Sequence, residues 1–245
     1  HLRGYMSVAM NQNALKSLLH ALSGFEIVDE FDLDEAHHET AFGLNPPQAV
    51  LVIQKGEETV RISFGDWNNY LKKRYVTIDD TQQVGLASDH LFQLISQPRT
   101  YFLDLRLFPF AADKINEIRI ERGGEVDHLR QVRGGWTING EAADLPFVEG
   151  FLKNLESLRG WDVCDERGDY GFGVPRLRLV IKGEFGSGGE KDEVQILVGS
   201  QAEVAGGPEK LYYAFSREGG GPFLISQASL KGVSPRREVL MMEGG

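Results

Sequence analysis

The sequence contains a single cysteine, Cys164, so an internal disulfide is excluded. It contains no run of about eighteen to twenty apolar residues, the length that a membrane-spanning helix needs. Basic residues are in the minority, with 26 Lys and Arg against 36 Asp and Glu and a net charge of −10. Nucleic-acid backbones and anionic membrane surfaces favour Lys and Arg, so we expect neither as the main partner.

Motifs for nucleophilic catalysis and for nucleotide binding are also missing. No Gly-x-Ser-x-Gly elbow occurs in the chain. The stretch from Gly171 to Gly173 begins like a dinucleotide fingerprint, but it has no third glycine and leads through Pro175 into an expected strand rather than a helix. The glycines between 186 and 191 do not have the spacing of a P-loop. We therefore predict no bound cofactor.

The adjacent histidines His37 and His38 lie among acidic residues and are the strongest candidates for metal ligands. Neighbouring residues point to opposite faces of a strand, and on a helix they diverge by about 100°. Neither geometry favours chelation by a neighbouring pair. We interpret this segment as a solvated acidic loop and predict no metal site.

A repeated segment is the main positive feature of the sequence. A Phe-Gly pair leads through proline into an alternating apolar strand, a turn and a second alternating strand that ends in glycine. The alternating apolar residues of the two copies, aligned on their Phe-Gly pairs, fall in step once two residues are dropped after that pair. The glycine that ends each second strand is expected in a turn with positive φ. The motif residues are Phe42, Gly43, Pro46, Pro47 and Gly65 in the first copy, and Phe172, Gly173, Pro175 and Gly199 in the second.

The similarity extends over roughly ninety residues and predicts an internal duplication. We expect an α+β fold with two tandem repeats, each an antiparallel β-meander with an amphipathic helix before it and a short helix after it. The predicted boundaries are a lead-in or expression remnant over residues 1–12, a first repeat over 13–108, a connecting β-meander over 109–144 and a second repeat over 145–245.

Residues that invite a catalytic interpretation fall at corresponding places in both copies. Asp29 and Glu30 correspond to Asp165 and Glu166, at the end of an expected strand. Solvated turn positions are the simplest interpretation, and a carboxylate-based hydrolase remains an alternative. Cys164 takes the place of Val28, which predicts a buried, apolar-like thiol rather than a nucleophile. Several aromatic residues are expected to pack across strands, with a ligand groove as the alternative; they are Trp67, Tyr70, Tyr75, Tyr101, Tyr212 and Tyr213.

The motif Phe-Gly-Leu-x-Pro-Pro, the two alternating strands and the Leu- and Arg-rich segment from Tyr101 resemble the family called domain of unknown function 4340. The resemblance covers about Ala14 to Leu240. It implies a bacterial protein, usually behind an N-terminal membrane helix, with the remainder outside the cytoplasm and with transporter-type neighbours. The family has no established catalytic residues. The implied location is therefore extracytoplasmic, periplasmic or at the cell surface, with a possible tether through a removed N-terminal segment.

Three functional hypotheses follow. The favoured one is a non-enzymatic interaction or accessory component of a membrane-associated assembly, which recruits an unidentified protein partner at an exposed strand edge. The second is a small-molecule or glycan binding protein with a site between the repeats. The third is the hydrolase described above. The sequence leaves the oligomeric state open.

Overall fold

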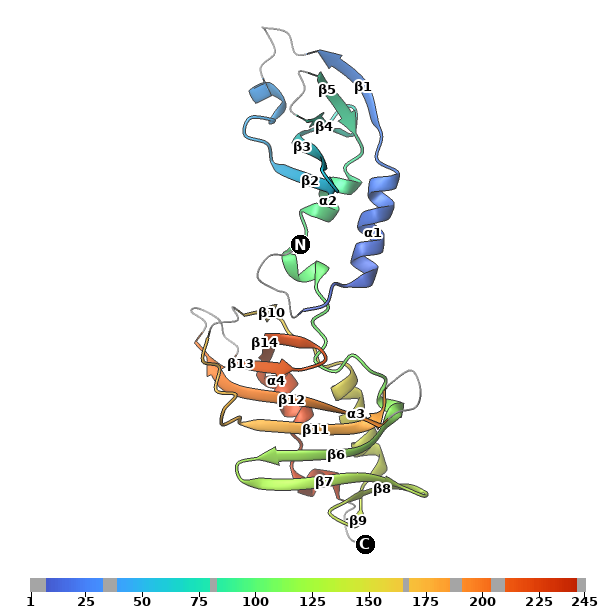
Figure 1. Ribbon diagram of the computed structural model, residues 1–245, viewed down its shortest axis with the longest axis vertical. Helices are drawn as coiled ribbons and strands as arrows, with labels where there is room; N and C mark the ends of the chain where they lie inside the picture. Colours follow the sequence, from blue (N-terminus) through green and yellow to red (C-terminus); the bar gives the residue numbers. More distant parts are fainter. Residues whose placement is uncertain are drawn as a thin grey trace. The chain divides into compact units, whose positions relative to one another are not determined.

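The computed structural model describes residues 8–32, 39–79, 83–164, 168–185, 191–203 and 210–241. The chain divides into two compact units. The N-terminal unit is Met10–Phe102, and the C-terminal unit combines His1–Ala9 with Leu103–Gly245. Each unit contains an antiparallel sheet with helices, which confirms the predicted α+β class (Figure 1).

The N-terminal unit has a five-stranded sheet in the order β1-β5-β4-β3-β2. Helix α1 begins after Asn11, whose side chain accepts hydrogen bonds from the backbone N–H groups of Asn13 and Ala14, and it ends before Gly24 as predicted. Phe64 and Val76, both fully buried, lie at the centre of the core. The elements are α1 (Gln12–Ser23), β1 (Ile27–Asp32), η1 (Glu39–Phe42), β2 (Ala49–Lys55), β3 (Glu58–Asn68), β4 (Lys73–Ile78), β5 (Gln83–Ala87), α2 (His90–Ile95) and η2 (Arg99–Phe102).

The C-terminal unit has a nine-stranded sheet in the order β10-β14-β13-β12-β11-β6-β7-β8-β9. Helices α3 and α4 pack against each other on one face of this sheet (Figure 1). Asp144 caps α3 by accepting a bond from the backbone N–H of Phe147, as its sequence position predicts. The elements are η3 (Ala112–Lys114), β6 (Ile115–Arg122), β7 (Glu125–Val132), β8 (Gly135–Ile138), β9 (Glu141–Ala142), α3 (Leu145–Glu156), β10 (Asp162–Val163), β11 (Leu177–Glu184), β12 (Lys191–Ala202), β13 (Leu211–Ser216), β14 (Gly220–Ser226), α4 (Gln227–Val233) and α5 (Arg237–Leu240).

The two sheets share a strand order and a register. In chain order, β1 to β5 correspond to β10 to β14, and both sets are arranged first-fifth-fourth-third-second. Leu51 lies opposite Ile62 in the first hairpin, and Leu179 lies opposite Ile196 in the second. Both third strands have an irregularity at one place, after Phe64 in β3 and after Val198 in β12. One constant offset in residue number therefore relates β2 to β11, and a larger one relates β3 to β12, because the connection between β11 and β12 is longer.

The offset between β2 and β11 also extends to the residues before these strands, and it corrects the predicted alignment of the Phe-Gly pairs. A Cβ atom on Gly65 would lie 2.2 Å from the carbonyl oxygen of Phe42, and one on Gly199 would lie 1.9 Å from that of Tyr170. Gly43 and Gly171 both have left-handed φ values, 66° and 76°. Phe42-Gly43 therefore corresponds to Tyr170-Gly171, two residues before the predicted pair, and no residue has to be dropped. The prediction was wrong because a second aromatic-Gly pair, Phe172-Gly173, follows at once.

Gly65 and Gly199 were also expected in turns with positive φ, and this prediction was wrong. Both lie inside strands, β3 and β12, and neither has a left-handed backbone. Glycine is needed there because the backbone that leads into β2 or β11 passes directly over the strand.

The unit boundaries differ from those predicted. The segment 109–144 is no separate connector, because β6 pairs along its length with β11 and extends the C-terminal sheet. Residues 8–12 are no simple lead-in either. Val8 is buried in the core of the C-terminal unit, and Asn11 caps α1. Both differences come from contacts between residues far apart in the chain: β6 pairs with β11, and Val8 packs into the core of the C-terminal unit.

Candidate functional site

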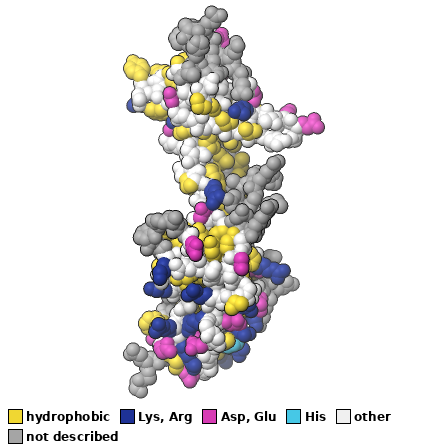
Figure 2. Space-filling view, turned by 90° about the vertical axis from the view of Figure 1, so that its left-hand side faces the viewer, with side chains coloured by type: hydrophobic (Ala, Val, Ile, Leu, Met, Phe, Trp, Pro, Cys, Tyr) yellow, Lys and Arg dark blue, Asp and Glu magenta, His cyan; other side chains and the backbone are white. Residues whose placement is uncertain are grey.

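Charged side chains of both signs are interspersed on the face of the C-terminal unit that is shown in Figure 2. Four ion pairs join side chains of β6, β7 and β11, including Arg119 with Glu121 at 2.8 Å and Lys182 with Glu117 at 3.4 Å. None of the helices in the described residues is long and apolar enough to cross a membrane.

The two open sheets end in four edge strands, β1 and β2 in one and β10 and β9 in the other. Exposed edges offer unpaired backbone groups, and proteins protect them by short length, bulges or charge. Strands β9 and β10 are only two residues long. Strand β1 is irregular between Val28 and Phe31, has Asp29 at φ 53°, and exposes Asp29, Glu30 and Asp32. Three of the four edges are therefore protected.

Strand β2 has none of these protections along its first five residues. It pairs with β3 in an unbroken register from Ala49 to Lys55. Its sequence from Ala49 to Ile53 is Ala-Val-Leu-Val-Ile, and Val50 and Val52 are 37% and 56% exposed. Among the described residues, no strand pairs with its outer side. We call the outer side of Ala49–Lys55 the β2 edge.

The hairpin geometry decides which backbone groups this edge offers. Strands β2 and β3 are joined by the two residues Gly56 and Glu57, with Lys55 opposite Glu58. The residues that flank a two-residue hairpin loop bond to each other, and the pattern then alternates along the strand. The N–H and C=O groups of Val50, Val52 and Gln54 therefore point away from β3, toward the position of a further strand.

The C-terminal sheet contains a strand in that position. Strand β11 corresponds to β2, and its outer side pairs with β6. Leu177, Leu179 and Ile181 on β11 are 1%, 0% and 0% exposed. Their counterparts on β2, Ala49, Leu51 and Ile53, are only half-buried. The positions that are half-buried on β2 are thus fully buried on β11, which has β6 beside it and shares a core with residues of α3.

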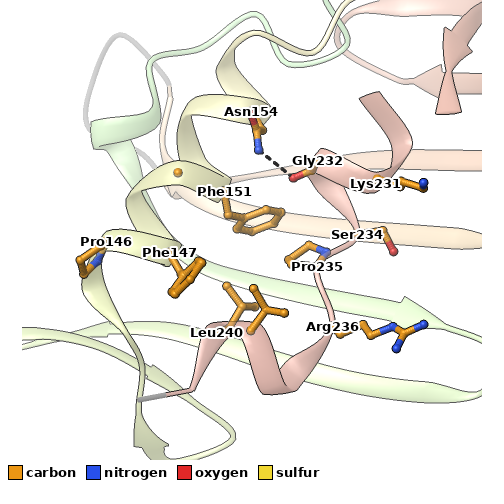
Figure 3. Close-up of a pocket in the computed structure, with 12 residues that line it drawn as sticks. Pro146, Phe147, Phe151, Asn154, Lys231, Gly232, Ser234, Pro235, Arg236 and Leu240 are labelled. Atoms are coloured by element: carbon orange, nitrogen blue, oxygen red, sulfur yellow. Dashed lines mark hydrogen bonds between the residues drawn. The ribbon is translucent and has the colours of Figure 1, made fainter. Parts of the chain in front are cut away.

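A hollow of about 510 Å³ between α3 and the α4–α5 segment is a second candidate (Figure 3). Phe147, Phe151 and Leu240 face one another across it, while the cationic groups of Lys231 and Arg236 extend away from it. The Asn154 amide donates to the carbonyl oxygen of Gly232 at 3.1 Å and joins the two helices. A ligand site needs polar groups that converge on its centre. We interpret the hollow as a seam between packed helices.

The predicted motif residues lie where the chain enters β2 and β11. Phe42 packs against Tyr75 with ring centroids 4.8 Å apart, and Pro47 forms a bridge with Leu44. The Asn45–Pro46 bond is cis. In the other unit, Phe172 packs near Phe215, with centroids 5.9 Å apart, and Pro175 comes just before β11. Gly173 has open space around its Cα atom. These residues position the hairpins and bring no reactive groups together.

The other candidates from the sequence do not form a reactive cluster in the described part of the chain. His37, His38, Asp165 and Glu166 lie outside the described residues. Asp29 and Glu30 are exposed on β1. No group of three or more possible metal ligands occurs among the described residues.

The single thiol and the aromatic residues differ in exposure. Cys164 is half-buried rather than buried, because it follows the short edge strand β10. Tyr212 is buried at 5% exposure, whereas Tyr70 is 93% exposed. Tyr75 and Tyr213 each pack against an aromatic residue, Phe42 and Tyr170. Neither contact is cross-strand, because Phe42 belongs to η1 and Tyr170 lies in the segment before β11.

A surface ion pair in the C-terminal unit gives a pH-dependent prediction. The Arg106 side chain donates to both carboxylate oxygens of Asp104, at 2.9 and 3.1 Å from Nε, and this bonding lowers the pKa of Asp104 below its ordinary value of 3.8. A lowered folded-state pKa adds stability above the unfolded pKa, and this is lost as the pH falls through the folded pKa. We expect Asp104→Asn to reduce the unfolding free energy by less than about 1 kcal/mol at pH 7, because Arg106 is partly exposed.

Urea unfolding of both proteins at pH 7 and below pH 3.8 measures this difference. The difference should shrink at the lower pH, where the wild-type carboxylate becomes protonated. A difference that stays the same at both pH values would contradict the assignment.

A family comparison matches residues 1–175 to Domain of unknown function (DUF4340). The match covers the whole N-terminal unit and continues through β6–β9, α3 and β10. The chain belongs to the DUF4340 family. The matched region stops short of the predicted limit near Leu240 and ends just before β11. No curated protein and no solved structure matches this DUF4340 chain.

Proposed function

We propose that this DUF4340 chain is a non-enzymatic binding module that recruits a protein partner by strand addition at the β2 edge. The observation that carries the proposal is the contrast between β2 and β11. The outer side of β11 pairs with β6, whereas the outer side of its equivalent β2 pairs with no strand in the described part of the chain. Strand addition supplies affinity through main-chain hydrogen bonds and specificity through alternate side chains.

The proposal includes an origin by duplication. The common strand order, the common hairpin register and the two glycines beneath a crossing backbone support it. Under this origin, β6–β9 is an element that only the C-terminal sheet incorporates. The N-terminal sheet keeps the same edge available for a strand from another polypeptide.

The proposed setting is extracytoplasmic, as an accessory component of a membrane-associated, transporter-type assembly. This part rests on what is typical of DUF4340 proteins. An interaction domain fits that setting because it needs no catalytic centre and uses the sheet as a rigid support for the edge.

A pair of lysine substitutions tests the proposal. We expect Val52→Lys, which places a charge on the β2 edge, to reduce recovery of natively co-purifying partners by about tenfold or more. Val126→Lys is the matched control, because Val126 is similarly exposed, at 41%, but lies on the internal strand β7. Hydrogen exchange on the wild-type complex should show new protection in β2. Unchanged recovery with Val52→Lys, together with no protection in β2, would contradict the proposed function.

A further inference from the structure

The pairing of β11 with β6 shows what a neighbouring strand presents at this place in the fold. On the open face of the sheet, Arg178 and Lys182 of β11 lie directly opposite Glu121 and Glu117 of β6. The Lys182 ammonium lies 3.4 Å from the Glu117 carboxylate, and Arg178 Nε lies 3.9 Å from that of Glu121. Two carboxylates on the added strand thus meet two cations on the receiving strand.

Strand β2 has no cationic side chain at either of the two corresponding positions. The constant offset between β2 and β11 puts Val50 in the place of Arg178 and Gln54 in the place of Lys182, while Val52 corresponds to Val180. A carboxylate opposite Val50 or Gln54 would lose part of its hydration without gaining an ion pair. The β2 edge therefore disfavours an acidic strand of the β6 type.

The other face of the edge sets a second requirement. Ile120 and Ile118 of β6 lie opposite Leu179 and Ile181, and all four are fully buried. Leu51 and Ile53 hold the corresponding places on β2 and are half-buried. A strand that covers them must carry apolar residues at two alternate positions.

From these two requirements we infer that the partner of the β2 edge is an antiparallel, extended segment of another protein, with apolar residues opposite Leu51 and Ile53 and neutral residues opposite Val50 and Gln54. The inference rests on the proposed function and specifies its partner. The β2 edge would then select among partner segments by the charge of their side chains, because the main-chain hydrogen bonds are the same for every sequence.

An extended segment fits this edge better than a second copy of the chain. Only five residues of β2, Ala49–Ile53, form its apolar run. Pairing two such runs edge to edge covers far less than the roughly 800 Å² per partner of a stable protein–protein interface. An extended segment binds through the ladder and alternate side chains without requiring two rigid surfaces to match.

Two peptides and two receiving edges test the inference. The first peptide has the β6 sequence of residues 115–122, and the second carries Glu117→Thr and Glu121→Thr in that sequence. They are titrated into the full chain and into its Val50→Arg/Gln54→Lys variant, which restores the charges of β11. Fluorescence anisotropy gives the dissociation constants, and circular dichroism verifies that the variant is folded.

We expect the peptide with Glu117→Thr and Glu121→Thr to bind the wild-type edge about tenfold more tightly than the peptide with the β6 sequence, and the order to reverse on the charged edge. Hydrogen exchange should show protection at Val50, Val52 and Gln54. Equal binding of both peptides to both edges would overturn the charge selection and leave strand addition standing. Binding of neither peptide to either edge, with no protection in β2, would overturn strand addition itself. Self-association of the wild-type chain through β2, measured by sedimentation without peptide, would identify a second copy as the occupant and overturn the inference.

Discussion

Replacing Arg74 with methionine should lower the unfolding free energy of the N-terminal unit by about 3 kcal/mol or more, because it breaks a buried ion pair and leaves its partners unsatisfied. The Arg74 side chain is 7% exposed, and its Nε lies 2.5 Å from Asp89 Oδ1. Its NH1 group donates to Gln48 Oε1 at 2.9 Å and to the carbonyl oxygen of Gly65 at 2.5 Å. The guanidinium also stacks over the Phe92 ring, 3.5 Å from its centroid.

These bonds explain why a single side chain has so large an expected effect. Asp89 directly precedes α2, Gln48 precedes β2, and Gly65 belongs to β3. Arg74 thus joins a helix to two strands from its own position on β4. Lysine cannot replace it, since an ammonium group lacks the planar fork that reaches several acceptors and stacks on a ring.

Urea unfolding, followed by hydrogen exchange in β3–β5, measures the loss in the full chain. Arg119→Ala is the matched control, because the Arg119 side chain also pairs with a carboxylate, at 2.8 Å, but is 46% exposed. We expect the control to change stability by less than about 1 kcal/mol. An Arg74→Met change no larger than that of the control would show that the buried network contributes little.

Gly199→Ala should destabilise the C-terminal unit by about 3 kcal/mol or more, at or beyond the upper end of the usual cost of overpacking. The new Cβ atom would lie 1.9 Å from the carbonyl oxygen of Tyr170. The obstacle is backbone rather than a flexible side chain, so relief requires the segment before β11 to move away from β12. Gly65→Ala should have the same effect on the N-terminal unit, where the obstacle is the carbonyl oxygen of Phe42 at 2.2 Å.

A third glycine provides a control of opposite sign. Gly150 lies inside α3, and a Cβ atom added to it would have no neighbouring atom within 4 Å. Gly150→Ala should therefore stabilise the C-terminal unit by up to about 1 kcal/mol, through the higher helix propensity of alanine. Thermal unfolding of the three variants compares these effects. A Gly199→Ala protein as stable as wild type would contradict the close backbone approach.

Local patterns predicted much of the fold. Alternation at period two placed both hairpins, and their observed registers pair the predicted apolar residues, such as Leu51 with Ile62. The capping residues Asp144 and Gly24 marked two helix ends correctly. These features depend on residues close together in the chain, and a single sequence displays them directly.

The pairing of β6 with β11 was not predictable in this way. Ile118 and Ile181 are direct partners, yet they lie far apart in the sequence. An alternating strand indicates which face it buries, but it does not indicate which neighbour it joins. For that reason, the segment 109–144 was interpreted as a connector.

The candidate site was only partly predictable for the same reason. Exposed strand edges were expected to recruit a partner, but the identity of the edge strand follows from the strand order. One local signal did exist: Val50 and Val52 interrupt the polar face that an exposed strand normally shows. The Arg74 network gave no signal, because its acceptors come from separate elements.

The chain enters and leaves the N-terminal unit at neighbouring points. The backbone N–H of Asn11 donates to the carbonyl oxygen of Phe102 at 2.9 Å, and that of Asp104 donates to Ala9 at 2.7 Å. Residues 10–102 are therefore inserted between two adjacent positions of the other unit. Deleting them and closing the gap with a short glycine-containing turn should leave a shortened protein whose nine-stranded sheet is intact. A truncation that begins at residue 145 would instead remove β6–β9 and strip β11 of its neighbour.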